Sequence, residues 1–208
     1  MDKNQLIIMF QDVLHRRLSM GTIMDLDTIA ELNEPPVNVW KFTNEIRGAL
    51  QSTSKLYGFS PTNFEGYKNE SMFYTILFDV FTNSYNPDIN GDFDINKIEE
   101  GFLPQKFVVG SDETPLPFVG GSRQGELDGV TYQEIVSVFG EPSHSEPSGD
   151  NKVQVEWDIK FDNGVRASIY DYKQYNMDPK DIDFWSIGGN SESSAAEVYK
   201  SMGLIKPI

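Results

Sequence analysis

The chain has 208 residues, with 17 Lys and Arg against 32 Asp and Glu, a net charge of −15 and no cysteine. These counts exclude disulfides, thiolate catalysis and zinc sites built from cysteine. The negative charge disfavours nucleic acid and anionic lipid as partners and favours basic protein surfaces. The 14 Phe, 9 Tyr and 3 Trp supply enough large side chains for a folded core.

Two further absences concern the location of the protein. No apolar run reaches the length of a membrane span, and the N-terminus lacks a signal-peptide pattern. We therefore expect a cytoplasmic protein that is not inserted in a membrane. The sequence leaves its oligomeric state open.

The first half of the chain is predicted to be helical. An amphipathic helix at the N-terminus ends near Gly21, and a short helix is expected at residues 28–32. A longer helix follows, with Trp40, Ile46 and Leu50 on its buried face. The run ESMFYTILFDVF is apolar nearly all round, which predicts a buried helix over residues 70–81.

The segment NPDINGDFDINKIEE has the spacing of an EF-hand calcium loop. Its sixth place, however, holds Phe93 where such loops need a glycine. Pro87 interrupts the helix before the loop, and Gly101 and Pro104 leave little room for a helix after it. The alternative is a polar joint between two halves of the chain, residues 87–101. The candidate metal ligands are Asp88, Asn90, Asp92, Asp94 and Glu99.

The second half is predicted to combine helices with strands. A capping box that begins at Thr131 starts a helix, which ends at Gly140. Alternate residues of VQVEWDIKF are apolar, which predicts a strand, and the turn DNG leads into a second strand, VRASIYDYK. We expect a three-residue turn with Gly164 in the left-handed conformation, because this register pairs Trp157 with Ile169 on one face.

A further strand, DFWSIGG, and a final helix, SESSAAEVYKSMG, complete the predicted fold. The fold class is therefore α+β, with a helical N-terminal half and a C-terminal antiparallel sheet flanked by helices. The predicted organisation is a helical region at residues 1–86, the acidic joint at residues 87–101, and an α+β domain at residues 102–208.

The motifs TYQEIVSVFGEPS, VEWDIKFDNGVRASIYDYK and FWSIGG resemble those of a group of small phage-encoded accessory proteins without an assigned activity. The resemblance covers residues 125–189. Relatives in that group often have a histidine where this chain has Ser186, so a role tied to that histidine is absent. The resemblance implies a phage accessory protein that acts in the host cytoplasm, and it implies no particular reaction.

The segment LDTIAELNEPPVNVWKFTNEIR has a more distant resemblance to the helix-turn-helix of Rha-type phage regulators. Pro35 and Pro36, however, occupy the position of the tight turn. Only Lys41 and Arg47 are available to contact phosphates, and acidic residues surround them. This charge balance favours an ordinary helical hairpin.

Asp171 is the most informative carboxylate of the second half. In the predicted register it lies opposite Val155 on the apolar face, where a carboxylate needs a partner. One interpretation is that it accepts hydrogen bonds from backbone amides at the rim of the sheet. The alternative is a binding surface, since exposed aromatic rings around a fixed charge are typical of interaction hot spots. The candidate residues of this surface are Trp157, Tyr170, Asp171, Tyr172, Lys173 and Trp185.

The sequence contains no nucleophile elbow, phosphate-binding loop or pair of metal-binding histidines, so an enzyme is not predicted. The leading hypothesis is a non-enzymatic phage protein that binds and inhibits or sequesters a host protein with a basic surface, for example one used in defence or transcription. The alternatives are a calcium-binding module at the acidic loop and a DNA-binding regulator. Calcium is the one cofactor considered.

Overall fold

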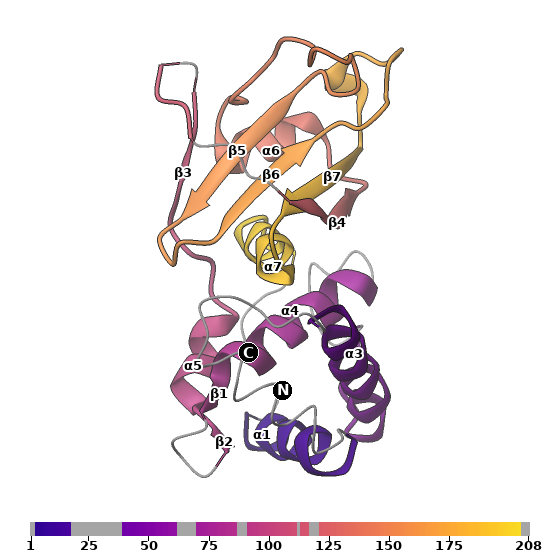
Figure 1. Ribbon diagram of the computed structural model, residues 1–208, viewed down its shortest axis with the longest axis vertical. Helices are drawn as coiled ribbons and strands as arrows, with labels where there is room; N and C mark the ends of the chain where they lie inside the picture. The colour runs from indigo at the N-terminus through magenta and orange to yellow at the C-terminus, as the bar shows by residue number, and fades with distance from the viewer. Residues whose placement is uncertain are drawn as a thin grey trace. The chain divides into compact units, whose positions relative to one another are not determined.

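The structure, a computed structural model, divides the chain into two compact units that meet in sequence between Leu103 and Pro104 (Figure 1). The first unit is helical, and the second contains an antiparallel sheet with flanking helices, which confirms the predicted α+β class. Among the described helices, none combines the length and the hydropathy that crossing a bilayer requires. The structure describes residues 3–17, 39–61, 70–86, 91–111, 113–116 and 121–204.

The first unit consists of helices and one small hairpin. Its elements are α1 (Lys3–Asp12), the π-helical turn η1 (Val13–Arg17), α3 (Val39–Leu56), α4 (Glu70–Ser84), β1 (Tyr85–Asn86), β2 (Asp92–Phe93) and α5 (Ile95–Gly101). The predicted buried helix is α4, and α3 buries Ile46 and Leu50 as expected. Several predictions lie outside what the structure describes. They are the helix end at Gly21, the short helix at residues 28–32, the burial of the Trp40 side chain and much of the helix-turn-helix candidate.

An aromatic cluster forms the core of the first unit. Phe10 of α1, Phe81 of α4 and Phe93 of β2 have ring centroids 5.0–5.2 Å apart. Tyr85 is paired with Phe93 in the β1–β2 hairpin, and α5 packs on α4. The described part of the acidic segment therefore belongs to the first unit. The ring of Phe93 is part of a hydrophobic core, while the joint expected at residues 87–101 stays a prediction.

The second unit is built on a five-stranded antiparallel sheet with the strand order β3-β5-β6-β7-β4. Its elements are β3 (Phe107–Val109), β4 (Ser122–Asp128), α6 (Tyr132–Phe139), β5 (Glu156–Phe161), β6 (Arg166–Tyr170), the 3-10 turn η3 (Pro179–Asp181), β7 (Phe184–Gly189) and α7 (Glu192–Ser201). The predicted capping box at Thr131 and the C-cap at Gly140 are both present on α6.

The β5–β6 hairpin has the predicted three-residue turn. The N–H of Phe161 donates to the carbonyl of Val165 at 2.9 Å, and Gly164 has a φ of 87°. Trp157 lies opposite Ile169, as expected. This register places the large apolar side chains of both strands on one face, because side chains alternate along a strand.

Two tryptophans form the centre of this apolar face. The rings of Trp157 and Trp185 meet edge to face with centroids 5.5 Å apart, and neither side chain is exposed. The indole N–H of Trp157 donates to the carbonyl of Gly140 at 2.9 Å, and that of Trp185 to the carbonyl of Val130 at 2.8 Å. Because these carbonyls flank α6, the two indoles fix that helix behind the sheet (Figure 1) while their rings fill the core.

Two glycines let α7 approach the apolar side of the sheet. A Cβ at Gly189 of β7 would collide with the side chain of Ser194 in the first turn of α7, and a Cβ at Gly125 of β4 would collide with Tyr199. The hydroxyl of Tyr199 accepts a hydrogen bond from the N–H of Glu126 at 3.2 Å. The glycines are therefore required by helix–sheet packing, since a side chain would hold the helix away.

We expect Gly189→Ala to lower the free energy of unfolding of the second unit by about 1–3 kcal/mol, because α7 must shift to make room for the new methyl group. Urea denaturation followed by tryptophan fluorescence measures this change. The control is Gly149→Ala, where the added Cβ meets no atom within 4 Å. Equal stability of the two variants would contradict the close packing of α7.

Candidate functional site

The structure separates the six predicted surface residues into a buried and an exposed group. Trp157 and Trp185 are fully buried, so the expectation that they line a binding surface is wrong. They are buried because α6 covers the face from which they project. Tyr170 is half-buried, whereas Tyr172 and Lys173 are exposed.

Asp171 is fully buried and acts as a backbone anchor. Its Oδ1 accepts hydrogen bonds from the N–H groups of Gln154 at 2.7 Å and Val155 at 2.8 Å. The side-chain amide of Gln154 donates to Oδ2 at 3.3 Å. The first interpretation of this carboxylate, a partner for amides at the rim of the sheet, is therefore confirmed.

This anchor ties together the two loops at one end of the sheet, residues 143–155 and 171–183. The N–H of Lys173 donates to the carbonyl of Lys152 at 2.8 Å, so the two loops are also joined by their backbones. Asn151 and Lys173 are the non-glycine residues with positive φ in the described part of the chain. Left-handed backbone is uncommon at residues other than glycine and asparagine, and at Lys173 the hydrogen bond to Lys152 accompanies it.

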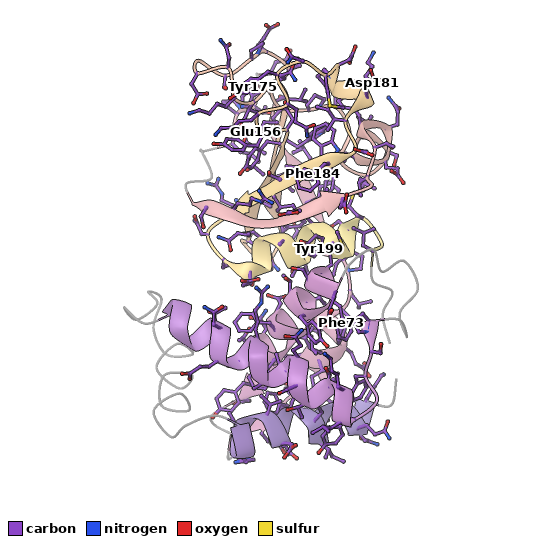
Figure 2. All side chains as sticks on the ribbon, turned by 90° about the vertical axis from the view of Figure 1, so that its right-hand side faces the viewer. Phe73, Glu156, Tyr175, Asp181, Phe184 and Tyr199 are labelled. Atoms are coloured by element: carbon purple, nitrogen blue, oxygen red, sulfur yellow. The ribbon has the colours of Figure 1, made fainter. Side chains whose placement is uncertain are left out.

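The second loop presents an aromatic patch, which we define as Tyr172, Tyr175 and Met177. All three side chains are exposed. The side-chain amide of Gln154 holds this loop in place, because it donates to the carbonyls of Gln174 at 3.0 Å and Met177 at 3.2 Å. Figure 2 shows Tyr175 and Asp181 on this loop, beyond the strand residues Glu156 and Phe184.

A row of polar side chains crosses the second face of the sheet, which we call the open face. Glu156 pairs with Tyr170, Tyr170 with Ser186, and Ser186 with Glu126, across four neighbouring strands. His144 extends the row through a backbone bridge with Glu156. Both α6 and α7 pack on the apolar face, so neither helix covers this row. Tyr170 also contacts Tyr172, with ring centroids 6.4 Å apart, which joins the row to the aromatic patch.

Two carboxylates lie close together on the open face. Glu156 and Asp158 are separated by one residue on β5, so both project from the same side. Burial raises the pKa of Glu156 and the charge of Asp158 raises it further, against the hydrogen bond from Ser168 and the charge of His144. Burial also raises the pKa of Asp158, and His144, with its Nε2 3.3 Å from Oδ2, opposes this. Burial is therefore the main reason why the ionised forms of both carboxyl groups are disfavoured here.

In the acidic loop of the first unit, three candidate ligands have protein partners. Asp94 caps α5 by accepting a hydrogen bond from the N–H of Asn96 at 2.9 Å. Glu99 forms an ion pair with Lys3, and Asp92 accepts from a glutamine of α1 at 2.8 Å. These contacts are a helix cap, a surface ion pair and a part-buried hydrogen bond, so they do not by themselves indicate a metal site.

The backbone of this loop also differs from an EF-hand. Phe93 is a strand residue, and the left-handed position belongs to Gly91, with a φ of 72°. The sequence left little room for a helix before Gly101 and Pro104. A seven-residue helix, α5, nevertheless follows the loop and ends at Gly101. Within the described ranges no group of three or more His, Asp or Glu is placed to hold a metal ion. Asp88 and Asn90 lie outside those ranges, so the calcium site stays a prediction.

Sequence reasoning missed five residues of the site. Glu156 and Asp158 alternate with Trp157, and this pattern already placed them together on the face opposite the tryptophan. No local pattern placed His144, Tyr175 or Met177 in the site, because the positions of these three residues depend on hydrogen bonds between distant loops. The missed residues are His144, Glu156, Asp158, Tyr175 and Met177.

We expect Glu156→Gln to raise the free energy of unfolding at pH 7. The pKa of Glu156 is raised in the folded state, so its ionised form opposes folding, and this penalty disappears as the pH falls toward the ordinary value of 4.5. The stabilisation by glutamine should therefore shrink over the same range. Denaturation at several pH values measures it, and Asp162→Asn corrects for the loss of one charge. A glutamine variant that is less stable than the original protein at pH 7 would contradict the proposed electrostatics.

The chain was compared with protein-family models, with curated proteins and with solved structures. None of these three comparisons found a match to this chain.

Proposed function

We propose that this is a non-enzymatic binding protein that inhibits or sequesters a host protein with a basic surface. The proposed binding surface is the aromatic patch together with the adjoining open face. The observation that carries the proposal is the exposure of three large apolar side chains on one firmly held loop: Tyr172 is 46%, Tyr175 54% and Met177 41% exposed. Tyrosine is among the residues that dominate the binding energy of protein interfaces.

The rigidity of the patch supports a role in binding. A flexible loop loses conformational entropy when a partner orders it, and that loss weakens the complex. Here Asp171 fixes the start of the loop, and Gln154 bonds to two of its carbonyls. The side-chain amide of Gln174 also donates to the carbonyl of Phe184 at 2.6 Å, which fixes the loop to β7. The aromatic side chains are thus positioned before any partner arrives.

Charge supports a basic partner. The loop that carries the aromatic patch also exposes Asp178, Asp181 and Asp183, and the open face adds the half-buried carboxylate of Glu156. The whole chain has a net charge of −15. Such a field accelerates association with a positively charged surface and makes that association sensitive to salt.

The resemblance of residues 125–189 to phage accessory proteins supports a partner from the host. It also explains why inhibition or sequestration is proposed rather than a metabolic role. A binding protein of this kind needs an exposed and preformed surface, which the aromatic patch provides.

The double variant Tyr172→Ala/Tyr175→Ala tests the proposed surface. Proteins retained from host lysate by the immobilised chain are identified and purified, and their affinity is measured by calorimetry. Removal of two hot-spot rings should weaken binding at least roughly tenfold, and binding should also weaken as salt is raised.

The matched control is Leu56→Ala, which removes an exposed apolar side chain from the other unit. This variant should bind its partner as the original chain does. The proposal fails if the lysate yields no partner, or if the double variant and the control bind the partner equally well.

A further inference from the structure

A cleft opens beside β5 at the end of the polar row. It lies between the loop that follows α6 and the first residues of the strand, and its volume is about 340 Å³. Its lining combines two valines, two glutamates, two serines and a histidine: His144, Ser145, Glu146, Ser148, Val153, Val155 and Glu156.

The walls of the cleft are fixed by hydrogen bonds. The N–H of His144 donates to the carbonyl of Glu156 at 3.0 Å, and the N–H of Glu156 donates back at 2.9 Å. The hydroxyl of Ser148 accepts from the N–H groups of Lys152 and Val153, both at 3.1 Å. Asp171 also holds the backbone just before β5, by accepting from the N–H groups of Gln154 and Val155. The cleft therefore exists before any ligand enters it.

The carboxylates at the cleft favour a cation as its ligand. Glu156 is half-buried at its edge and stands one residue from the buried Asp158 on the same face of β5, so two carboxylates share this end of the open face. Burial is the main cause that raises the pKa of each, because it disfavours the ionised form, and a bound cation would offset that cost. The compensating groups that face them are His144 from the loop, and Arg166 and the hydroxyl of Ser168 from β6, while Asp171 adds further negative charge.

We propose that this cleft receives a lysine side chain of the basic partner. This inference rests on the proposed function and names the chemical group that the same surface recognises. Val153 and Val155 offer apolar contact to the methylene chain, and Glu156 receives the ammonium group. A lysine combines these two properties, a long apolar stem and a compact charge with three donors.

Two contacts within the chain, one on the loop of the aromatic patch and one on the open face, show that this unit accommodates cations on aromatic rings. The ammonium of Lys173 lies 5.1 Å from the ring centre of Tyr172. The guanidinium of Arg123 lies 5.8 Å from the ring centre of Phe184. Tyr170, whose backbone is paired with that of Glu156, is half-buried on the same face of the sheet. Carboxylates and aromatic rings are both groups that bind ammonium ions, and the second unit already uses its rings in this way.

A titration with Nα-acetyl-lysine methylamide tests the inference without the partner. Amide chemical shifts of the full chain are recorded with this probe, with the uncharged norleucine analogue and with the arginine analogue. We expect saturable shifts at His144, Val155 and Glu156 with the lysine probe, at a dissociation constant on the order of 10 mM, and weaker shifts with the other two probes.

Glu156→Gln should weaken this binding at least roughly fivefold, because the glutamine keeps the shape of the side chain and loses its charge. Glu146→Gln provides a second variant of the cleft, and Asp162→Asn, at the opposite end of β5, should bind the probe normally. Binding should also fade as the pH falls and Glu156 takes up a proton.

The outcomes separate this inference from the proposed function. Probe binding that depends on Glu156 supports the cleft even if no partner is found in lysate. The inference is overturned if the probe produces no saturable shifts, if the norleucine analogue binds equally well, or if Glu156→Gln leaves binding unchanged. It is also overturned if a partner binds through Tyr172 and Tyr175 with an affinity that Glu156→Gln does not alter.

Discussion

The carboxylate of Asp171 is the interaction on which the proposed binding surface depends. It joins the end of β6 to the start of β5 by accepting three hydrogen bonds, two of them from backbone amides. A side chain that only packs does not fix two loops in register, whereas an acceptor with defined geometry does. The aromatic patch and the cleft lie on either side of this anchor. Both sites therefore depend on one buried carboxylate.

The residues of the motifs that resemble phage accessory proteins mainly stabilise the fold. The indole groups of Trp157 and Trp185 hold α6 on the sheet, Gly189 admits α7, and Gly164 closes the hairpin. Gly188 faces Tyr170 and Ser168 with no room for a side chain. These residues serve helix–sheet packing and turn geometry, so the motifs specify a scaffold. The residues proposed to bind a partner, such as Tyr175 and Glu156, lie at its end and on its open face.

The features that could be predicted from the sequence are those that depend on residues close together in the chain. The capping box, the three-residue turn and the pairing of Trp157 with Ile169 all follow from spacing over a few residues. The alternation along β5 also showed which side chains share a face, but it could not show which face α6 would cover, and so two tryptophans were assigned to a surface. The place of Phe93 in the core likewise depends on α1 and α4, which are distant in sequence.

Hydrogen exchange in Asp171→Ala tests the role of this anchor most directly. In the original protein, the N–H groups of Gln154, Val155 and Lys173 should exchange slowly, because each donates within the joined loops. In the variant, these three amides should exchange much faster, while the amide of Ile169 in the sheet stays protected. Unchanged protection at Gln154 and Val155 would contradict the anchor, since the loops would then be held by other contacts.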